Sequence, residues 1–505
     1  MNQPTNPSGL VKKELGLFDA ISIIVGIVIG AGIFETAPFI LGNVSSPWLG
    51  LSAWAAGGLL SLIGALCYAE LATTYPREGG DYVYLSRAFG RWLGFLFGWG
   101  QLAVVLTASI GSMAYVFADY AVKLFHPAGA DGGPASRASS YAFLYASAAV
   151  IVLSALNILG VMLGKAAQNF FTVAKVLGLG GILVAGFFWG QGASALAVAP
   201  DNAKAVAEGG ATAWGLVMIL VLYTYGGWND AAFVAAEVRN PKRNIPRALI
   251  FGTLGITAIY LLVNAAYIMG LGFSSAQQSQ GIAADVLRLP LGDFGHKAMC
   301  LLVMVSALGA VNGLIFTGSR VYWKLGSENS IFAALGHWHP RLGAPHWSLL
   351  TQAAICLSMI FVVGSETGRN AVNGLLTRLG ANPVQWSGHG GFEILVTCSA
   401  PIFWAFFLLT GVSLFVLRVK DRHLSRPFSV PLFPIVPLIF CGMCGYMLYS
   451  AVIYAHEKFN WFGYFAWVLL GLGVPLYFLS RHPEQTTPAA DAEGTPEAEP
   501  EGAGA

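Results

Sequence analysis

Apolar runs of about 20 residues or more recur along this chain, and short segments between them hold most of the charged residues. About 20 apolar residues is the length that an α-helix needs to cross the hydrocarbon core of a bilayer. Charged residues make up only 10% of the 505 positions and hydrophobic residues 56%, whereas soluble domains carry roughly 25% charged residues. The sequence therefore predicts an all-α integral membrane protein.

About twelve segments have the length and composition of a transmembrane helix. The candidate spans are residues 18–42, 48–75, 89–124, 139–158, 166–190, 213–236, 247–272, 294–325, 347–364, 393–417, 430–454 and 460–480.

Lysine and arginine predict the orientation of these spans, because both residues are enriched in cytoplasmic segments. With the N-terminus inside, 18 of them fall in inner segments and 8 in outer segments; Lys175, inside a span, completes the total of 27. We expect both termini to be cytoplasmic, with no cleaved signal peptide. Low lysine with high alanine and glycine content favours a bacterial inner (plasma) membrane.

Spans and tails together give an expected domain organisation. The first tail is polar, and the last is rich in Pro, Ala, Glu and Thr, a composition that remains disordered. We expect a cytoplasmic N-terminal tail, a first group of five helices, a second group of five, two further helices and a disordered cytoplasmic tail, at residues 1–17, 18–190, 213–417, 428–480 and 483–505 respectively.

Two of the spans contain helix-breaking residues near their middle. The first span holds Gly30-Ala31-Gly32, and the sixth holds Gly226-Gly227 followed by Asn229-Asp230, where favoured N-cap residues could begin a new helical stretch. Unwound backbone at mid-membrane is tolerated only where it lines a cavity or is buried in protein. A pair of such breaks in corresponding positions indicates a transporter site, whereas glycines that only permit tight helix packing are the alternative.

The spacing of the two breaks predicts how the halves are related. The first and sixth spans are five apart, so the two five-helix groups would enter the membrane in opposite senses, as in inverted-repeat transporters. Half-helix N-termini offer N–H groups to a carboxylate, and freed carbonyls accept hydrogen bonds from an ammonium group. Both features in one small cavity suit a zwitterionic amino acid.

Lys175 is the only lysine placed deep in an apolar span. A charge inside a membrane is costly, so such a residue is functional or tightly paired unless its side chain reaches the interface. Glu70 and Glu237 lie near inner span ends, where solvated or loop-pairing roles are expected, and Asp230 could either cap a helix or take part in coupling.

The sequence lacks the residue patterns that are typical of other function classes. The six cysteines all lie in apolar segments and the histidines fall in loops or at span ends, so neither a metal site, a cofactor nor an enzyme active site is expected. A net charge of +2 gives no sign of a nucleic-acid surface.

Four sequence blocks in order carry a family resemblance. They are GIVIGAGIF in the first span, ALCYAELATTYPREGGDYVYL at 65–85, YTYGGWNDAAFVAAEVRNPKRNIPRAL at 223–249 and SALGAVNGLIFTGSRVYWKLGSE at 306–328. With these blocks the chain resembles the amino acid–polyamine–organocation superfamily, in particular bacterial amino acid permeases and L-type amino acid transporters. The resemblance implies the LeuT-type five-plus-five inverted-repeat fold with helices 1 and 6 broken, and alternating access.

The resemblance also implies roles for individual residues. Amides of Ala31 and Gly32, with Gly30 beside them, would bind the substrate carboxylate. Tyr223 and Gly226, together with Val28, would bind the amine through their carbonyls, and Asn229 would lie near the site.

Lys175 matches a lysine of sodium-independent members, whose ammonium takes the place of a sodium ion. Tyr260 matches a tyrosine that helps link that lysine to helix 1. Ala31 departs from the serine common at its position, which removes a hydroxyl. The outer segment between the third and fourth spans has no cysteine, so no disulfide-linked heavy chain is expected.

The expected function is sodium-independent transport of an amino acid, with neutral ones favoured, by proton symport or by exchange. Aromatic and aliphatic residues flank the breaks, which favours neutral substrates over polyamines. A polyamine carrier of the same fold and a membrane-embedded amino acid sensor remain alternatives. The sequence leaves open the particular substrate, the choice between symport and exchange, the oligomeric state and the role of the outer segment 365–392.

Overall fold

The computed structural model describes residues 13–30, 32–77, 79–126, 135–190, 214–215, 217–279, 281–378, 380, 382–384, 386 and 390–480. Ten helical segments in this part are long and apolar enough to cross a membrane. They are α3 (Pro47–Thr74), α5 with η2 and α6 (Arg91–Gly100, Gln101–Val105 and Leu106–Phe125), α7 (Ala135–Ile158), α8 (Val161–Phe188), α10 (Pro241–Leu271), α13 (Phe294–Glu328), α14 (His346–Gly364), α16 (Gly391–Lys420), α17 (Ile435–Phe459), and η6 with α18 and α19 (Asn460–Tyr464, Phe465–Gly471 and Gly473–Leu479).

These ten segments confirm that the protein is an all-α, multi-pass membrane protein, and they coincide with ten of the predicted spans. Three of them differ most from the predicted starts. Helix α8 begins five residues earlier, at Val161, α10 begins six residues earlier, at Pro241, and α17 begins five residues later, at Ile435. Pro241 occupies the first turn of α10, where its missing N–H has no helical partner to lose.

The remaining two predicted spans are divided in the structure. Residues 18–42 form α1 (Leu17–Val28) and α2 (Gly32–Gly42). Within 213–236, residues 217–224 are helical, a turn covers 225–227, and the 3₁₀-helix η4 (Trp228–Glu237) follows.

Shorter helices complete the described chain. They are α4 (Asp81–Phe89), α11 (Phe273–Gln278), α12 (Ile282–Leu291), η5 (Ser330–Phe332) and α15 (Glu366–Arg378). Helix α15 lies within the polar segment 365–392.

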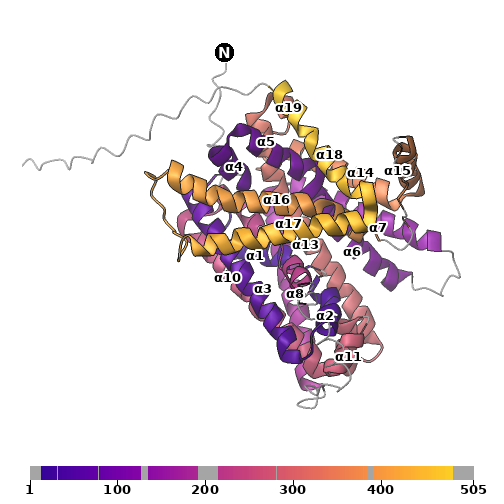
Figure 1. The fold of residues 1–505 in the computed structure, drawn as a ribbon. Helices are drawn as coiled ribbons and strands as arrows, with labels where there is room; N and C mark the ends of the chain where they lie inside the picture. The colour runs from indigo at the N-terminus through magenta and orange to yellow at the C-terminus, as the bar shows by residue number, and fades with distance from the viewer. Residues whose placement is uncertain are drawn as a thin grey trace, which may run out of the picture.

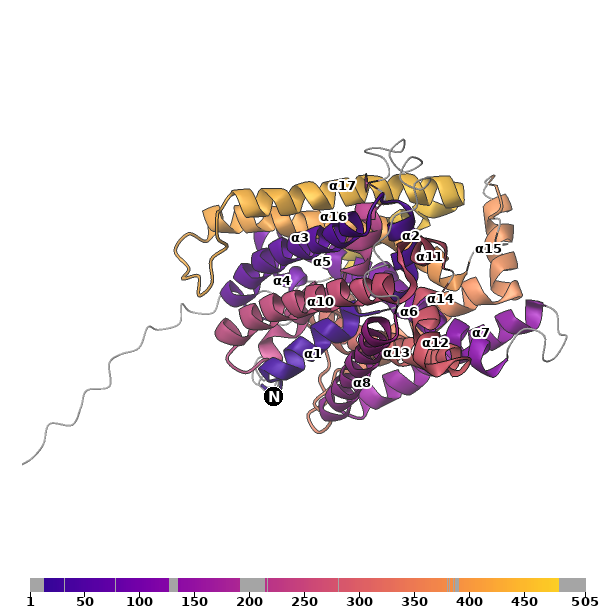
Figure 2. The same ribbon diagram turned by 90° about the horizontal axis from the view of Figure 1, so that it is seen from below.

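The long helices pack side by side around the two divided ones. In Figures 1 and 2, α16 lies along α17 and α3 lies along α10. Helix α1 contacts α8, α10 and α13. The carbonyl groups at the end of α1 are therefore surrounded by protein, where lipid does not reach them.

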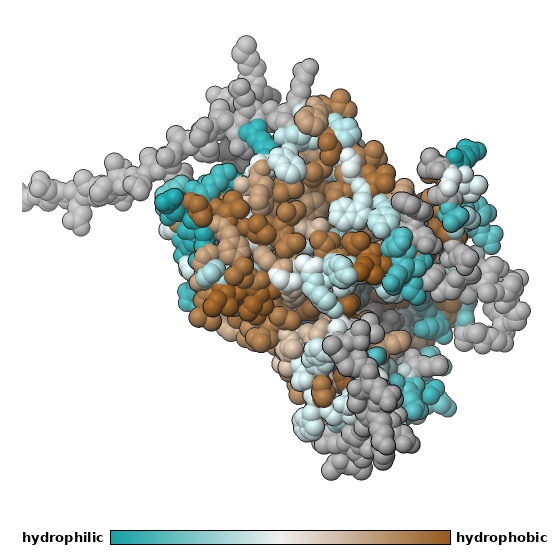
Figure 3. Space-filling model, viewed as in Figure 1, coloured by the Kyte–Doolittle hydropathy of each residue, from teal (hydrophilic) through white to brown (hydrophobic). Residues whose placement is uncertain are grey.

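The surface has the distribution expected of a membrane protein. Figure 3 shows hydrophobic residues over the middle of the face that carries α16 and α17, and hydrophilic residues near the ends of the molecule. Exposed aromatic and aliphatic side chains of α17, such as Leu438 and Tyr449, lie on this surface. The exposed apolar area is consistent with contact with lipid tails.

Buried ion pairs close one end of the helix bundle. Glu70 is 1% exposed and bonds Arg418 at 2.5 Å and Arg426 at 3.3 Å. Glu237 is equally buried and receives a bidentate pair from Arg320 at 2.6 and 3.1 Å. Solvated or loop-pairing roles were expected for both acids. The structure pairs both with arginine, and the partner of Glu237, Arg320, lies within α13 and not in a loop.

Candidate functional site

The first interruption follows the end of α1. Ile29 closes the helix by donating its N–H to the carbonyl of Val25, and the N–H of Gly30 donates to the carbonyl of Val28 at 2.8 Å. Helix α2 begins at Gly32. Residue Ala31, predicted to bind a carboxylate, lies outside the described residues.

Lys175 on α8 donates hydrogen bonds to the backbone around the first interruption. Its side chain is fully buried, and its Nζ donates to the carbonyls of Gly26 at 2.7 Å, Ile29 at 2.6 Å and Ser306 at 3.1 Å. The hydroxyl of Ser306 also donates to the carbonyl of Ile29, at 2.8 Å. A helix leaves its last carbonyls without intrahelical partners, and here a cation and a hydroxyl replace those partners.

The second interruption packs directly against the first. Gly227 has a φ of 107°, a left-handed conformation that only glycine adopts without a steric cost. A Cβ atom there would lie 2.6 Å from Cγ2 of Ile27. A glycine is therefore required at 227 both by the turn and by the close approach of α1.

Tyr260 on α10 connects the two interruptions. Its hydroxyl lies 2.9 Å from the carbonyl of Val28 and 3.1 Å from the carbonyl of Thr224. Tyr260 is fully buried and packs against the rings of Trp54 and Tyr225. Tyr260 therefore contacts both the end of α1 and the helix that precedes the second break.

Asn229 and Asp230 do not cap a new helix, contrary to the sequence prediction. Helix η4 begins one residue earlier, at Trp228, and no side chain caps it. Both residues lie within the first turn, where Nδ2 of Asn229 donates to Oδ1 of Asp230 at 3.0 Å. Because the left-handed turn at Gly227 places the start of η4 at Trp228, Asn229 and Asp230 lie after the cap position. Both side chains line a cavity instead.

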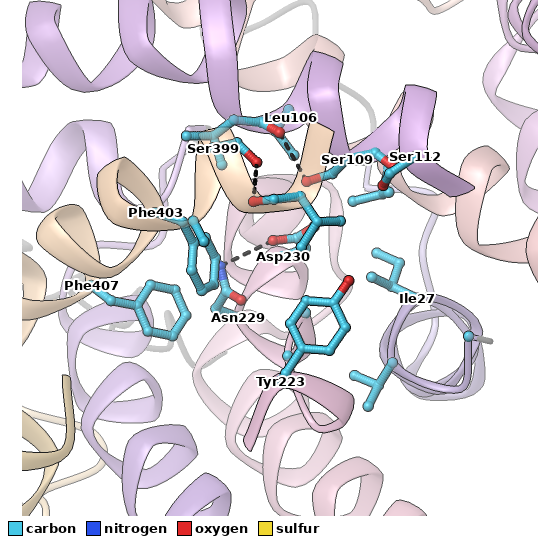
Figure 4. A pocket seen from close by; sticks show the side chains of 18 of the residues that line it. Ile27, Leu106, Ser109, Ser112, Tyr223, Asn229, Asp230, Ser399, Phe403 and Phe407 are labelled. Atoms are coloured by element: carbon cyan, nitrogen blue, oxygen red, sulfur yellow. Dashed lines mark hydrogen bonds between the residues drawn. The ribbon is translucent and has the colours of Figure 1, made fainter. Parts of the chain in front are cut away.

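A cavity lies between the two interruptions and is also lined by residues of α4, α5, η2, α6, α13 and α16; Figure 4 shows part of its lining. Its lining includes six of the predicted substrate-binding residues: Val28, Gly30, Gly32, Tyr223, Gly226 and Asn229. Lys175 and Tyr260 are not among the lining residues, and they hold the backbone from behind it.

Several cavity residues were missed by the sequence reasoning. They include one acid, Asp81 at the start of α4, and Ser109 and Ser112 of α6. Asp230, which the sequence marked as a capping or coupling residue, also lines the cavity. Helix α16 contributes Ser399 and an aromatic group at 403, 404, 406 and 407. The sequence offered one signal, the acid of the GGDYVYL block, because a carboxylate in so apolar a chain needs partners or a ligand.

Asp81 is anchored on one side only. Its Oδ1 accepts hydrogen bonds from the hydroxyls of Tyr68 at 2.5 Å and Thr410 at 2.6 Å. Its Oδ2 is buried and has no hydrogen-bond partner within the described residues. Asn229 is similar, since its Oδ1 is also buried without a partner there.

A multi-pass membrane protein with two interrupted helices facing a mainly apolar cavity that carries a few polar groups has the structure of a carrier for a small solute. Comparisons with known proteins are more specific. The amino acid permease family model matches residues 15–474. The chain belongs to the amino acid permease family, a class of transport proteins and not of enzymes.

Named relatives cover most of the chain. It is 29% identical over 480 residues to the human b(0,+)-type amino acid transporter 1, covering 94% of this chain and 88% of the relative. It is 28% identical over 481 residues to a serine/threonine exchanger of Bacillus subtilis, covering 94% of this chain and 98% of the relative. It is 29% identical over 479 residues to the mouse large neutral amino acids transporter small subunit 2, covering 93% of this chain and 81% of the relative.

Proposed function

We propose that the protein is a sodium-independent secondary transporter of neutral amino acids that works by exchange or by proton symport. Alternating access would involve a LeuT-type inverted repeat made of residues 18–190 and 213–417. The observation that carries this proposal is the Lys175 ammonium, which donates to the carbonyls of Gly26 and Ile29 beside the first break. A fixed cation there supplies the positive charge that a bound sodium ion would otherwise bring.

The proposed substrate site lies at the two breaks. The amides of Ala31 and Gly32, with Gly30 beside them, would bind the carboxylate, because half-helix N-termini attract anions. Tyr223 and Gly226, together with Val28, would bind the amine, with Asn229 close by. This assignment is supported by the cavity, which all of these residues except Ala31 line.

The amine must compete with internal hydrogen bonds in this structure. The carbonyl of Val28 accepts from Gly30 and Tyr260, and the carbonyl of Tyr223 accepts from Gly226 at 3.1 Å. Since a carbonyl oxygen has two lone pairs and that of Val28 already accepts from two donors, Val28 has to exchange a partner to bind the amine.

The names of the relatives support the proposed mode of transport. One relative is named as an exchanger of serine and threonine and another as a transporter of large neutral amino acids. Exchange of neutral amino acids is accordingly the first mode to test here. We further propose an inner (plasma) membrane location with both termini cytoplasmic, and action without a disulfide-linked heavy chain, since residues 126–139 contain no cysteine.

Uptake by purified protein in liposomes tests the proposal. A labelled mixture of neutral amino acids is supplied with and without sodium, a proton gradient and internal substrate. We expect uptake that ignores sodium and rises with internal substrate or with the proton gradient, which separates exchange from symport. Strictly sodium-dependent uptake would overturn the role given to Lys175. Binding seen as a thermal shift, without any uptake, would indicate a sensor.

A further inference from the structure

A cationic surface patch lies around the start of α10, in a part of the chain that the proposed substrate site does not use. It consists of five exposed side chains, which are Lys13, Arg239, Lys242, Arg243 and Arg247. None of these side chains takes part in an ion pair between described residues. Like charges four residues apart on a helix, as at Arg243 and Arg247, repel each other. The patch is therefore suited to an anionic partner.

Hydrogen bonds hold the segments that carry the patch in place. The N–H of Leu15 donates to the carbonyl of Glu237 at 3.0 Å, and the N–H of Arg239 donates to the carbonyl of Leu15 at 2.8 Å. Nε of Arg239 also donates to the carbonyl of Lys13, at 3.2 Å. The residues before α1 thus lie against those that follow η4. Membrane orientation favours cations on one side of the bilayer, but it does not require that cations of separate segments meet.

The patch continues into a lipid-facing stripe of α10. Arg243 and Arg247 are about one turn apart, and Phe251, Leu254 and Leu262 follow within the same arc of about 100° on the helix surface. Phe251, Leu254 and Leu262 are 57%, 45% and 48% exposed, as expected where a helix contacts lipid tails. Figure 2 shows α10 beside α1 on the face turned toward the viewer. Cations and exposed apolar side chains therefore adjoin each other along one helix face.

This arrangement fits a phospholipid better than a soluble anion. An anionic phospholipid offers phosphate oxygens to the cations and acyl chains to the apolar stripe. Guanidinium groups bind phosphate through several N–H donors, and clusters of four or more cations at the end of a membrane helix attract anionic lipids. Residues 483–505 contain six acids and no lysine or arginine, so they match the charge of the patch, but they offer no acyl chain.

We propose that the patch binds the headgroup of an anionic phospholipid in the leaflet where α10 begins. Arg243 and Arg247 contact the phosphate, and the other three cations surround the headgroup. Because Lys13 precedes α1 and Arg239 follows η4, the bound lipid connects the start of the first interrupted helix with the end of the second. The lipid thereby stabilises the protein from outside the substrate cavity, which none of these five residues lines.

Lipid retention by the purified full chain tests the proposal. The protein is given equal amounts of phosphatidylglycerol and phosphatidylcholine in detergent, and native mass spectrometry counts the lipids that stay bound. The wild type should prefer phosphatidylglycerol and should gain thermal stability from it. We expect Arg243→Gln combined with Arg247→Gln to lower this preference at least about tenfold, because each cation near a lipid surface contributes to the attraction. The gain in unfolding temperature should disappear as well.

Two further variants control for net charge and for folding. Arg77→Gln combined with Arg422→Gln removes two exposed arginines outside the patch, so the net charge falls equally, and the lipid preference should remain as in the wild type. Arg243→Lys combined with Arg247→Lys keeps both charges and should retain most of the preference. The unfolding temperature without added lipid shows whether each variant is folded.

Three results would overturn the lipid site. An equal loss of preference in the test pair and in the Arg77 and Arg422 pair would reduce the effect to net charge. Equal stabilisation by inorganic phosphate would show that a free anion binds here. A rise in phosphatidylglycerol retention on deletion of residues 483–505, absent in the Arg243 and Arg247 variant, would make the acidic segment the occupant. None of these measurements involves transport, so a failure of this inference and a failure of the proposed function are distinguishable.

Discussion

The two sides of the cavity differ in how their polar groups are satisfied. On the side of the first interruption, the carbonyls of Gly26, Val28 and Ile29 receive hydrogen bonds from side chains of α8, α10 and α13. On the side of η4, Asn229 and the nearby Asp81 each keep a buried oxygen without a partner among the described residues. The carbonyls on the first side are hydrogen-bonded within the protein, whereas two side-chain oxygens on the side of η4 are not.

This difference indicates distinct roles for the two sides. A fully hydrogen-bonded, buried network holds one arrangement of groups, so the first interruption is suited to present its backbone in a fixed geometry. Buried acceptors without a partner are unfavourable, so the side of η4 is suited to receive hydrogen-bond donors from a ligand. The following variants test the first side, in order of decreasing expected effect.

Replacing Lys175 with alanine should have the largest effect. It removes the donor to the carbonyls of Gly26, Ile29 and Ser306, and leaving a buried acceptor unsatisfied costs about 1–3 kcal/mol per group. We expect at least a tenfold loss of uptake and a lower unfolding temperature. Lys297→Ala, which removes an exposed lysine, is the control. Wild-type uptake and stability in Lys175→Ala would show that the first interruption does not depend on this cation.

Gly227→Ala should have the next largest effect. The left-handed conformation costs an alanine about 1–2 kcal/mol, and the new methyl group would meet Ile27, with overpacking costing about 1–3 kcal/mol. We expect reduced stability and reduced uptake of every substrate. Gly181→Ala is the matched control, because a Cβ atom at Gly181 has open space around it. If Gly227→Ala is as stable as that control, the close contact of the two interruptions is not required.

Tyr260→Phe should have a moderate effect. The hydroxyl joins the carbonyls on either side of the cavity, and a hydrogen bond contributes about 0.5–1.5 kcal/mol. Because about 1.4 kcal/mol corresponds to a tenfold change, we expect a loss of substrate affinity of up to about tenfold.

Tyr267→Phe is an informative control for Tyr260→Phe, because Tyr267 lies on the same helix and its buried hydroxyl has no partner among the described residues. Removing that hydroxyl should leave affinity near the wild-type value. Equal effects of the two substitutions, measured as substrate-induced thermal shifts, would argue against a bridging role for Tyr260.

Ser306→Ala should have the smallest effect. The carbonyl of Ile29 loses the Ser306 hydroxyl but keeps the Lys175 ammonium at 2.6 Å, so no acceptor is left unpaired. We expect a loss in unfolding free energy within about 0.5–1.5 kcal/mol, and uptake close to the wild type. An effect as large as that of Lys175→Ala, measured side by side with the exposed Ser358→Ala, would mean that the network acts as one unit.

Much of the fold could be predicted from the sequence, because a membrane limits the possible structures. A span must satisfy its own backbone, so length and hydropathy located ten helices to within a few residues. The same rule made Gly30 to Gly32 and Gly226-Gly227 recognisable as breaks. Helix boundaries near Val161, Pro241 and Ile435 were less accurate, because interfacial residues are compatible with helix or loop.

The sequence by itself therefore determined that this chain spans a membrane, where two of its helices are interrupted, and that Lys175 lies deep in an apolar span. Only the tertiary structure decided which groups meet. Lys175 bonds a carbonyl 149 positions away, Thr410 holds an acid 329 positions away, and Asp81 joins Asp230 at one cavity. Hydropathy and glycine placement act on each helix alone, whereas these contacts depend on how the helices pack together, and that packing places the acidic residues beside the proposed amino acid site.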